Sequence, residues 1–156
     1  PYDLWERQGT LMTTEGNVVH YGYIEKFIER LGEKFNIREI AFDRWGAVQM
    51  VQNLEGMGFT VVPFGQGFKD MSPPTKELMK LVLEEKIAHG GHPVLRWMMD
   101  NIFIRTDPAG NIKADKEKST EKIDGAIATI MALDRAIRCG NGSHESVYDS
   151  RGILFI

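Results

Sequence analysis

The hydrophobic pattern between residues 21 and 64 switches repeatedly between a helical and a strand period, and this alternation most limits the folds open to the chain. Apolar residues first recur at helical spacing, at Ile24, Phe27, Ile28, Leu31 and Phe35. A buried strand follows over residues 37–42, then a helix over 47–57 and a strand over 59–64. Short connections between these elements predict parallel strands joined by crossover helices. The expected fold class is therefore α/β, with helices flanking a sheet.

The sequence pattern of the second half of the chain predicts helices and a β-hairpin. Residues 65–74 contain glycine and proline, so we expect a loop there that borders the functional groove. Ser72 would then be the N-cap, and Pro73 a first-turn residue, of a helix that runs to about Lys86. The remaining expected elements are a short helix over residues 93–101, a β-hairpin of residues 102–106 and 112–113, and a helix over residues 119–138.

Composition limits the size and the class of protein. The 156 residues, of which 42% are hydrophobic, fit one domain. No apolar run approaches the roughly 18 residues that a membrane span needs, so no membrane partner is expected. The 19 basic and 22 acidic residues give no global positive field, and any contact with nucleic acid must be local. The single cysteine, Cys139, excludes an internal disulfide, as expected in a reducing cytoplasm.

Asp43 is a candidate metal ligand because it stands where a buried strand is expected to end. Open α/β sheets bind their ligands at the carboxyl ends of the strands. The alternative is that Asp43 caps a helix beginning near Trp45, since aspartate is a preferred N-cap residue. Both interpretations fit the sequence.

Asp124 is a second candidate because it lies in an apolar stretch of the last expected helix. A buried carboxylate there needs a cation to remain ionised. Gly125 beside it would let the helix approach a strand closely. The alternative is a salt bridge from Asp124 to Lys122 or Arg135. Two carboxylates suit hard ions such as Mg²⁺, which can activate water and stabilise the leaving oxygen in phosphodiester hydrolysis.

Basic side chains crowd the hairpin and the approach to the last helix, where they could neutralise DNA phosphates. They are Arg105, Lys113, Lys116, Lys118 and Lys122. Acidic residues lie among them, at positions 107, 115, 117 and 121. A mixed, solvated surface is therefore the alternative to a DNA track.

Two further motifs predict no cofactor site. His89 and His92 flank Gly90 and Gly91, and two more ligands at zinc spacing are missing, so a polar turn is expected. The segment Gly65-Gln-Gly67 follows a strand as a phosphate loop does, yet it has neither a third glycine nor a Gly-Lys-Ser/Thr ending. Nucleotide binding is therefore not predicted for this chain.

Several segments resemble, in order, the nuclease part of the large terminase subunit of tailed bacteriophages. They are Ile40-Ala-Phe-Asp43-Arg-Trp45, Gln66-Gly-Phe68, Met71-Ser-Pro-Pro-Thr-Lys-Glu77, Gly90-Gly-His-Pro-Val-Leu-Arg-Trp97, and the segments 105–111, 118–125 and 146–152. The resemblance covers nearly the whole chain. It implies a ribonuclease H-like fold, a mixed sheet flanked by helices, in which three carboxylates hold two Mg²⁺ or Mn²⁺ ions. Asp43 would be the second carboxylate and Asp124 the third.

The same resemblance implies an N-terminally truncated piece of a longer protein, because the family's first carboxylate and its ATPase domain would precede Pro1. Residues 1–140 would form a partial nuclease domain and residues 141–156 a C-terminal tail. The missing first strands would leave a sheet edge open for pairing, for example with a second copy. The fragment alone is therefore expected to have an incomplete site.

The function implied by the resemblance is metal-dependent cutting of concatemeric double-stranded viral DNA during packaging in the host cytoplasm. The implied partners are viral DNA, the portal protein and the small terminase subunit, with no membrane. The alternative function is a non-catalytic module that grips DNA or docks on the portal.

Overall fold

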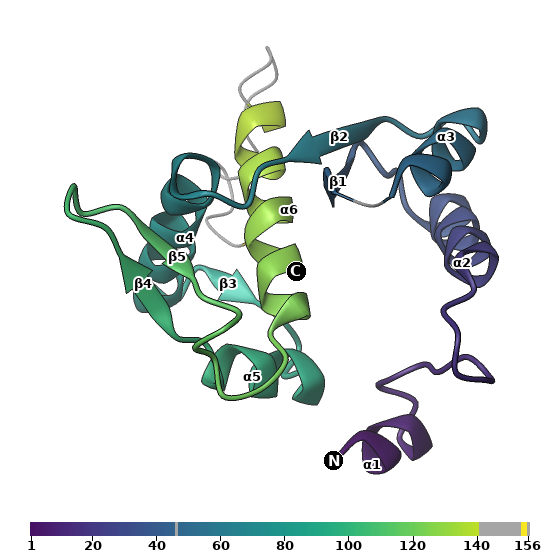
Figure 1. Cartoon of the computed structure of the whole chain (residues 1–156), viewed down its shortest axis with the longest axis horizontal. Helices are drawn as coiled ribbons and strands as arrows, with labels where there is room; N and C mark the ends of the chain where they lie inside the picture. The colour runs from purple at the N-terminus through teal and green to yellow at the C-terminus, as the bar shows by residue number, and fades with distance from the viewer. Residues whose placement is uncertain (46, 141–153, 156) are drawn as a thin grey trace. The chain divides into compact units, whose positions relative to one another are not determined.

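The computed structural model describes residues 1–45, 47–140 and 154–155 (Figure 1). The chain divides into two compact units, Pro1–Phe64 and Gly65–Ile156. The nuclease domain expected over residues 1–140 includes all of the first unit and most of the second. Its boundary with the tail remains a prediction, because residues 141–153 and 156 lie outside the described part of the chain.

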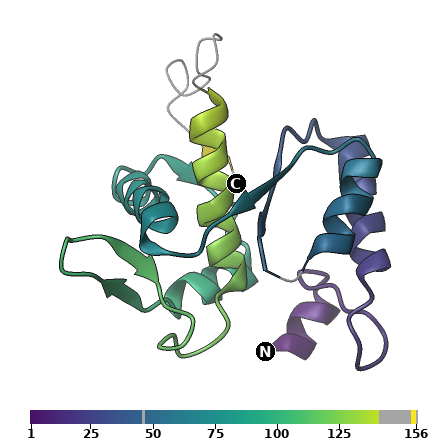
Figure 2. The same cartoon turned by 45° about the horizontal axis from the view of Figure 1, so that its top comes forward.

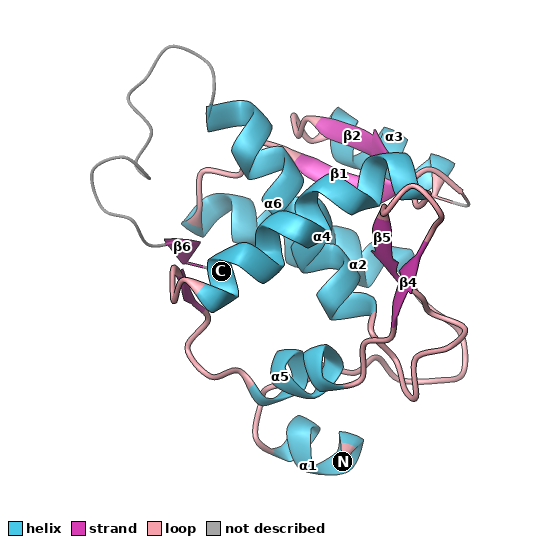
Figure 3. Ribbon diagram, turned by 90° about the vertical axis from the view of Figure 1, so that its left-hand side faces the viewer, coloured by secondary structure: helices cyan, strands magenta, loops and turns pink. Residues whose placement is uncertain are grey.

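The first unit contains a pair of parallel strands joined by a crossover helix. Its elements are α1 (Tyr2–Arg7), α2 (Tyr21–Lys34), β1 (Ile40–Asp43), α3 (Val48–Gly56) and β2 (Val61–Phe64). Strands β1 and β2 lie side by side in Figure 3, with Ile40 opposite Val61 and Asp43 opposite Phe64. The alternation of helix and strand expected from the hydrophobic pattern is confirmed.

Helix α2 packs less deeply than its amphipathic pattern predicts. It contributes no fully buried residue, although its apolar positions are half-buried. The side-chain amide of Asn53 in α3 donates a 2.9 Å hydrogen bond to the carboxylate of Glu25 and links the two helices. At Gly32 an added Cβ would lie 2.8 Å from the Phe59 ring, so α2 also approaches the chain beyond α3 closely.

The second unit is built around its last long helix. Its elements are α4 (Phe68–Leu83), β3 (Ile87–Ala88), α5 (Pro93–Asp100), β4 (Ile104–Thr106), β5 (Ile112–Ala114), α6 (Asp124–Gly140) and β6 (Leu154–Phe155). Helices α4 and α5 both pack against α6, as Figure 2 shows, and α4 also packs against β5. Much of the apolar core comes from α6, through Ala126, Ile127, Ile130, Met131 and Leu133.

The strands of the described residues pair two by two. Strands β4 and β5 form the expected antiparallel hairpin, whereas β3 pairs in parallel with β6. The α/β class is thus confirmed. The ribonuclease H-like arrangement stays a proposal, because the three sheets among the described residues are all two-stranded.

The prediction of a loop over residues 65–74 is wrong beyond Gly67, because α4 already begins at Phe68 and contains Pro73 and Pro74. Each proline removes a backbone donor, which normally breaks a helix. Burial offsets this cost here, since Met71 and Pro74 are almost completely inaccessible. Ser72 is therefore not an N-cap: its buried Oγ accepts a 3.1 Å hydrogen bond from the backbone N–H of Ile112 in β5.

The last long helix begins five residues later than expected, at Asp124 rather than Ser119. Residues 116–121 instead form turns and bends between the hairpin and α6. None of the helices in the described ranges is both long and apolar enough to cross a lipid bilayer.

Candidate metal and nucleic-acid site

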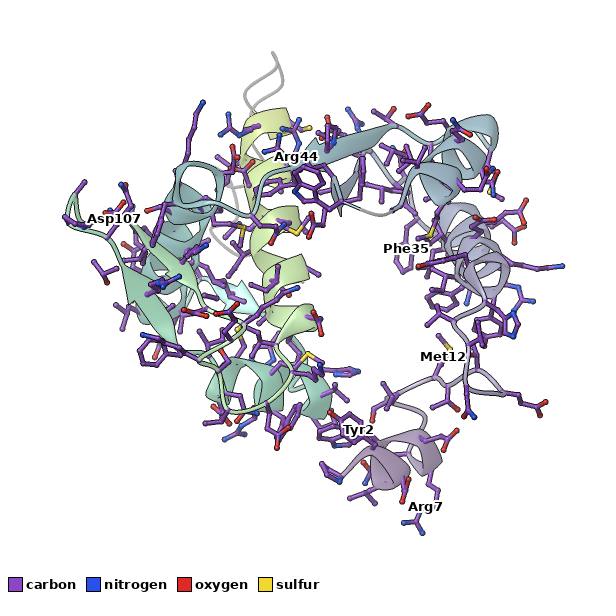
Figure 4. All side chains as sticks on the ribbon, in the orientation of Figure 1. Tyr2, Arg7, Met12, Phe35, Arg44 and Asp107 are labelled. Carbon is purple, nitrogen blue, oxygen red and sulfur yellow. The ribbon has the colours of Figure 1, made fainter. Side chains whose placement is uncertain are left out.

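Asp43 is the last residue of β1, as the sequence predicted, and its side chain is exposed. Its Oδ1 accepts a 3.3 Å hydrogen bond from the backbone N–H of Trp45, which closes a short turn at the end of the strand. Figure 4 labels Arg44, the residue between them. The N-cap interpretation of Asp43 is wrong, because α3 begins only at Val48 and Ala47 is its N-cap. The carboxylate therefore stands at the carboxyl end of a strand with much of its surface accessible.

Asp124 is the first residue of α6, and its side chain is 65% exposed. The expectation that it is buried among core positions is wrong: Ile123, Ala126 and Ile127 are buried, while Asp124 points to solvent from the helix start. Its Oδ1 lies 3.0 Å from the Nζ of Lys116, a salt-bridge partner that was not among the two considered from the sequence, Lys122 and Arg135. An acidic side chain in a first helical turn also interacts favourably with the helix dipole.

Gly125 allows a close approach, but to a helix rather than to the strand that we expected. A Cβ added there would lie 2.7 Å from the Sδ of Met98 in α5. The Gly125 N–H lies 3.1 Å from the same sulfur. This packing fixes the start of α6 against α5 and so fixes the backbone position of Asp124.

Asp115 organises the turn between β5 and α6, a role that the sequence analysis missed. Its Oδ1 accepts hydrogen bonds from the N–H groups of Glu117, at 2.9 Å, and Lys118, at 3.2 Å. Its Oδ2 is buried without a hydrogen-bond partner and lies 3.6 Å from the Nε of Arg105. Burial raises the pKa of Asp115, but the two N–H donors and the Arg105 charge outweigh it, so the pKa lies below its ordinary value.

Ser119 ties this turn to Phe103, the residue directly before β4. Its hydroxyl donates to the Asp115 carbonyl at 2.6 Å and accepts from the Phe103 N–H at 3.1 Å. The Asp115 N–H in turn donates to the Phe103 carbonyl at 2.8 Å. An aspartate directly after a strand, with a serine four residues later, is the pattern that would have identified the turn.

Most of the basic side chains proposed for DNA binding have partners within the second unit. Arg105 faces Asp115 and Lys116 faces Asp124. The Nζ of Lys113 lies 5.0 Å from the centroid of the Phe68 ring, and that of Lys118 lies 5.5 Å from the centroid of the Phe103 ring. Lys122 is exposed and joins no ion pair within the described ranges. The structure thus gathers these cations on the hairpin and the following turn, interleaved with Asp115 and Asp124.

Neither unit brings three potential metal ligands together among its described residues. The described residues contain no group of three or more His, Cys, Asp or Glu side chains placed to hold an ion. Asp43 belongs to the first unit and Asp124 to the second. Their oxygen donors nevertheless fit a hard divalent cation, and Asp124 already attracts a positive group, the Lys116 ammonium.

His89 and His92 form the polar turn expected from the sequence. The Nδ1 of His89 accepts from the Gly91 N–H at 3.2 Å, and that of His92 accepts from the Leu95 N–H at 3.4 Å, which caps α5. Both imidazoles are therefore used in backbone turns.

Comparison of the sequence and the structure with known proteins identifies the family of the chain. The chain is 41% identical over 138 residues to the large terminase subunit of Enterobacteria phage HK97, covering 87% of this chain and 27% of that protein. It is 31% identical over 138 residues to protein YmfN of Escherichia coli K12, covering 87% of this chain and 30% of that protein. The crystal structure of the HK97 large terminase matches 86% of this chain and 29% of its own, with a TM-score of 0.80 and 40% sequence identity.

The chain thus spans less than a third of the length of these relatives. Residues 1–139 match the family described as the endonuclease domain of the terminase large subunit. With this match and the identity to the HK97 subunit, the chain belongs to the terminase large subunit endonuclease family.

Proposed function

We propose that this chain supplies the nuclease chemistry of a longer, phage-type terminase large subunit, which cuts concatemeric double-stranded viral DNA by metal-dependent phosphodiester hydrolysis. Membership of the endonuclease family supports the reaction class. The assignment of residues is supported by the Asp124 carboxylate, which is exposed and lies beside the Lys116 ammonium. The packing of α6 on α5 holds this carboxylate in place. The proposed fold of the complete domain is ribonuclease H-like.

Asp43 and Asp124 would be the ligands of Mg²⁺ or Mn²⁺, since carboxylate oxygens are the donors that these ions prefer. When bound, such ions would activate the attacking water and stabilise the charge that develops on the leaving oxygen of the phosphodiester. Asp43 contributes a carboxylate fixed at a strand end by its hydrogen bond from Trp45. Asp124 contributes one at the start of a rigid helix. A third carboxylate is proposed to come from outside this chain.

The cations of the second unit would guide the DNA backbone. Lys118 and Lys122 are exposed, and Arg105 and Lys116 are about half exposed although each faces a carboxylate. Lys113 is half-buried over Phe68 and less accessible than the others. Neutralisation of phosphates by such a surface would make DNA binding weaken with salt. The proposed partners are viral DNA, the portal protein and the small terminase subunit, in the host cytoplasm.

Substitution of Asp124 in the intact large subunit tests the assignment. We expect Asp124→Asn to reduce Mn²⁺-dependent nicking of supercoiled plasmid by more than roughly 100-fold, because an amide is a poor ligand for a divalent cation. The side chain is exposed, so circular dichroism and thermal melting should change little. Asp100→Asn, an exposed carboxylate in α5, is the matched control and should retain cutting. Retained cutting by the Asp124 variant would refute the assignment.

The alternative is a non-catalytic module that grips DNA or docks on the portal. The Lys116–Asp124 ion pair favours it, because it satisfies the carboxylate within the protein itself. In that case both Asp124→Asn and Asp43→Asn would leave nicking unchanged, and Asp124→Asn would weaken DNA or portal binding instead.

A further inference from the structure

The turn between β5 and α6 brings Lys116 to Asp124. Lys116 directly follows Asp115, whose buried side chain and backbone hold the turn through Glu117, Lys118 and Ser119. The far side of the turn is anchored to Phe103. The backbone of Lys116 is therefore fixed, and only its flexible side chain must be ordered for the Nζ to reach the Asp124 Oδ1 at 3.0 Å.

Both partners of the ion pair are accessible to solvent. The Lys116 side chain is 52% exposed and that of Asp124 is 65% exposed. Exposed pairs of this kind are weak and are screened by salt. A small divalent cation that binds directly to a carboxylate oxygen can displace such an ammonium, because the two positive charges repel each other at one carboxylate.

We propose that Lys116 is a displaceable counter-cation of Asp124, which occupies the carboxylate before a metal ion binds and competes with that ion for Oδ1. The inference rests on the proposed function, in which Asp124 is a metal ligand. It gives the buried Asp115 a function as the positioning residue of Lys116. Divalent metal binding is then weaker than the carboxylates alone would allow, because each ion that binds must first displace the ammonium.

Mn²⁺ binding to the intact large subunit tests this without relying on activity. Free Mn²⁺ is measured by electron paramagnetic resonance in the absence of DNA and at low ionic strength. We expect Lys116→Gln to tighten Mn²⁺ binding by about two- to fivefold, the change that corresponds to loss of an exposed ion pair. Lys116→Arg keeps the cation and should bind Mn²⁺ as the wild type does. Lys122→Gln removes a nearby lysine that is not paired with Asp124 and is the matched control.

The outcomes separate this inference from the proposed function. Loss of Mn²⁺ binding in Asp124→Asn with unchanged affinity in Lys116→Gln would overturn the inference and leave the metal assignment standing. Equal tightening in Lys116→Gln and Lys122→Gln would also overturn it, because the effect would then be one of net charge. Wild-type Mn²⁺ binding by Asp124→Asn would refute the proposed function itself. Tightening in Lys116→Gln alone, which shrinks as KCl is raised, supports the competition.

Discussion

Asp107 shows how a single carboxylate shapes the second unit. It stands at the turn of the hairpin, where Figure 4 labels it. Its carboxylate accepts three hydrogen bonds, from the Ala109 N–H at 2.9 Å and from the backbone and side-chain N–H groups of Asn111, both at 2.8 Å. The Asn111 side chain, followed by the backbone donors, holds the pKa of Asp107 below its ordinary value. The ionised form is therefore the one that stabilises the turn.

The pH dependence of unfolding should reveal this carboxylate. A lowered pKa means that the folded state binds fewer protons than the unfolded state, so the stabilisation is complete well above about pH 3.9. It is lost as the pH falls through the lower pKa of the folded state. We expect Asp107→Asn to lower the free energy of unfolding in urea at pH 7, with the difference from wild type shrinking toward pH 2. An equal difference at both pH values would contradict this account.

For single residues, the sequence predicted the positions of the candidate carboxylates in the secondary structure. It predicted their exposure and their partners less well. The position of Asp43 follows from the end of a hydrophobic strand, which local pattern identifies. The exposure of Asp124 does not follow, because it depends on where α6 begins, and element boundaries are set by turn contacts. Asp115 was missed because its role consists of hydrogen bonds to residues after it and a charge on a neighbouring strand.

Among the elements, α4 departs furthest from its local sequence signals. Pro73 and Pro74 predict a helix start, but the helix extends five residues before them because its buried face packs on α6 and β5. Propensity is a weak prior that tertiary packing overrides. By contrast, the parallel pairing of β1 and β2 could be predicted, since short connections through a helix leave few other arrangements. Strand β3 has only two residues and no readable pattern.

Ser72 offers a test of how α4 holds the hairpin. Ser72→Ala leaves the Ile112 N–H without its acceptor, and we expect the free energy of unfolding to fall by about 1 kcal/mol. Thr75→Val is the comparison, because Thr75 is equally buried but its hydroxyl donates within α4, to Met71. Urea denaturation of both variants provides the measurement. A larger loss in Thr75→Val than in Ser72→Ala would show that the link to β5 contributes little.

At the scale of the whole molecule, the two units differ in how much they bury. Helix α6 contributes a continuous buried side, whereas α2 contributes no fully buried residue. Hydrogen bonds of a poorly buried helix open by local fluctuations that leave the rest of a protein folded. The units should therefore differ in local stability.

Amide hydrogen exchange of this 156-residue chain should resolve the difference. We expect backbone amides in the middle of α6 to exchange at least about 100-fold more slowly than those in the middle of α2, since burial governs the opening free energy. Mass spectrometry of peptides covering residues 21–34 and 124–140 provides the measurement. Equal protection in the two helices would mean that α2 opens only together with α6.

The pairing of β3 with β6 has a consequence for the order in which the protein forms during synthesis. Residues 87–88 leave the ribosome well before residues 154–155, with which they pair. Until then β3 lacks the strand with which it pairs in the folded unit, although α4, α5 and the hairpin can already fold from local contacts. Closing so long a loop is slower than forming a hairpin. Of the two described sheets of the second unit, β3–β6 is therefore expected to assemble after β4–β5, and β3 exposes an edge until residues 154–155 have been synthesised.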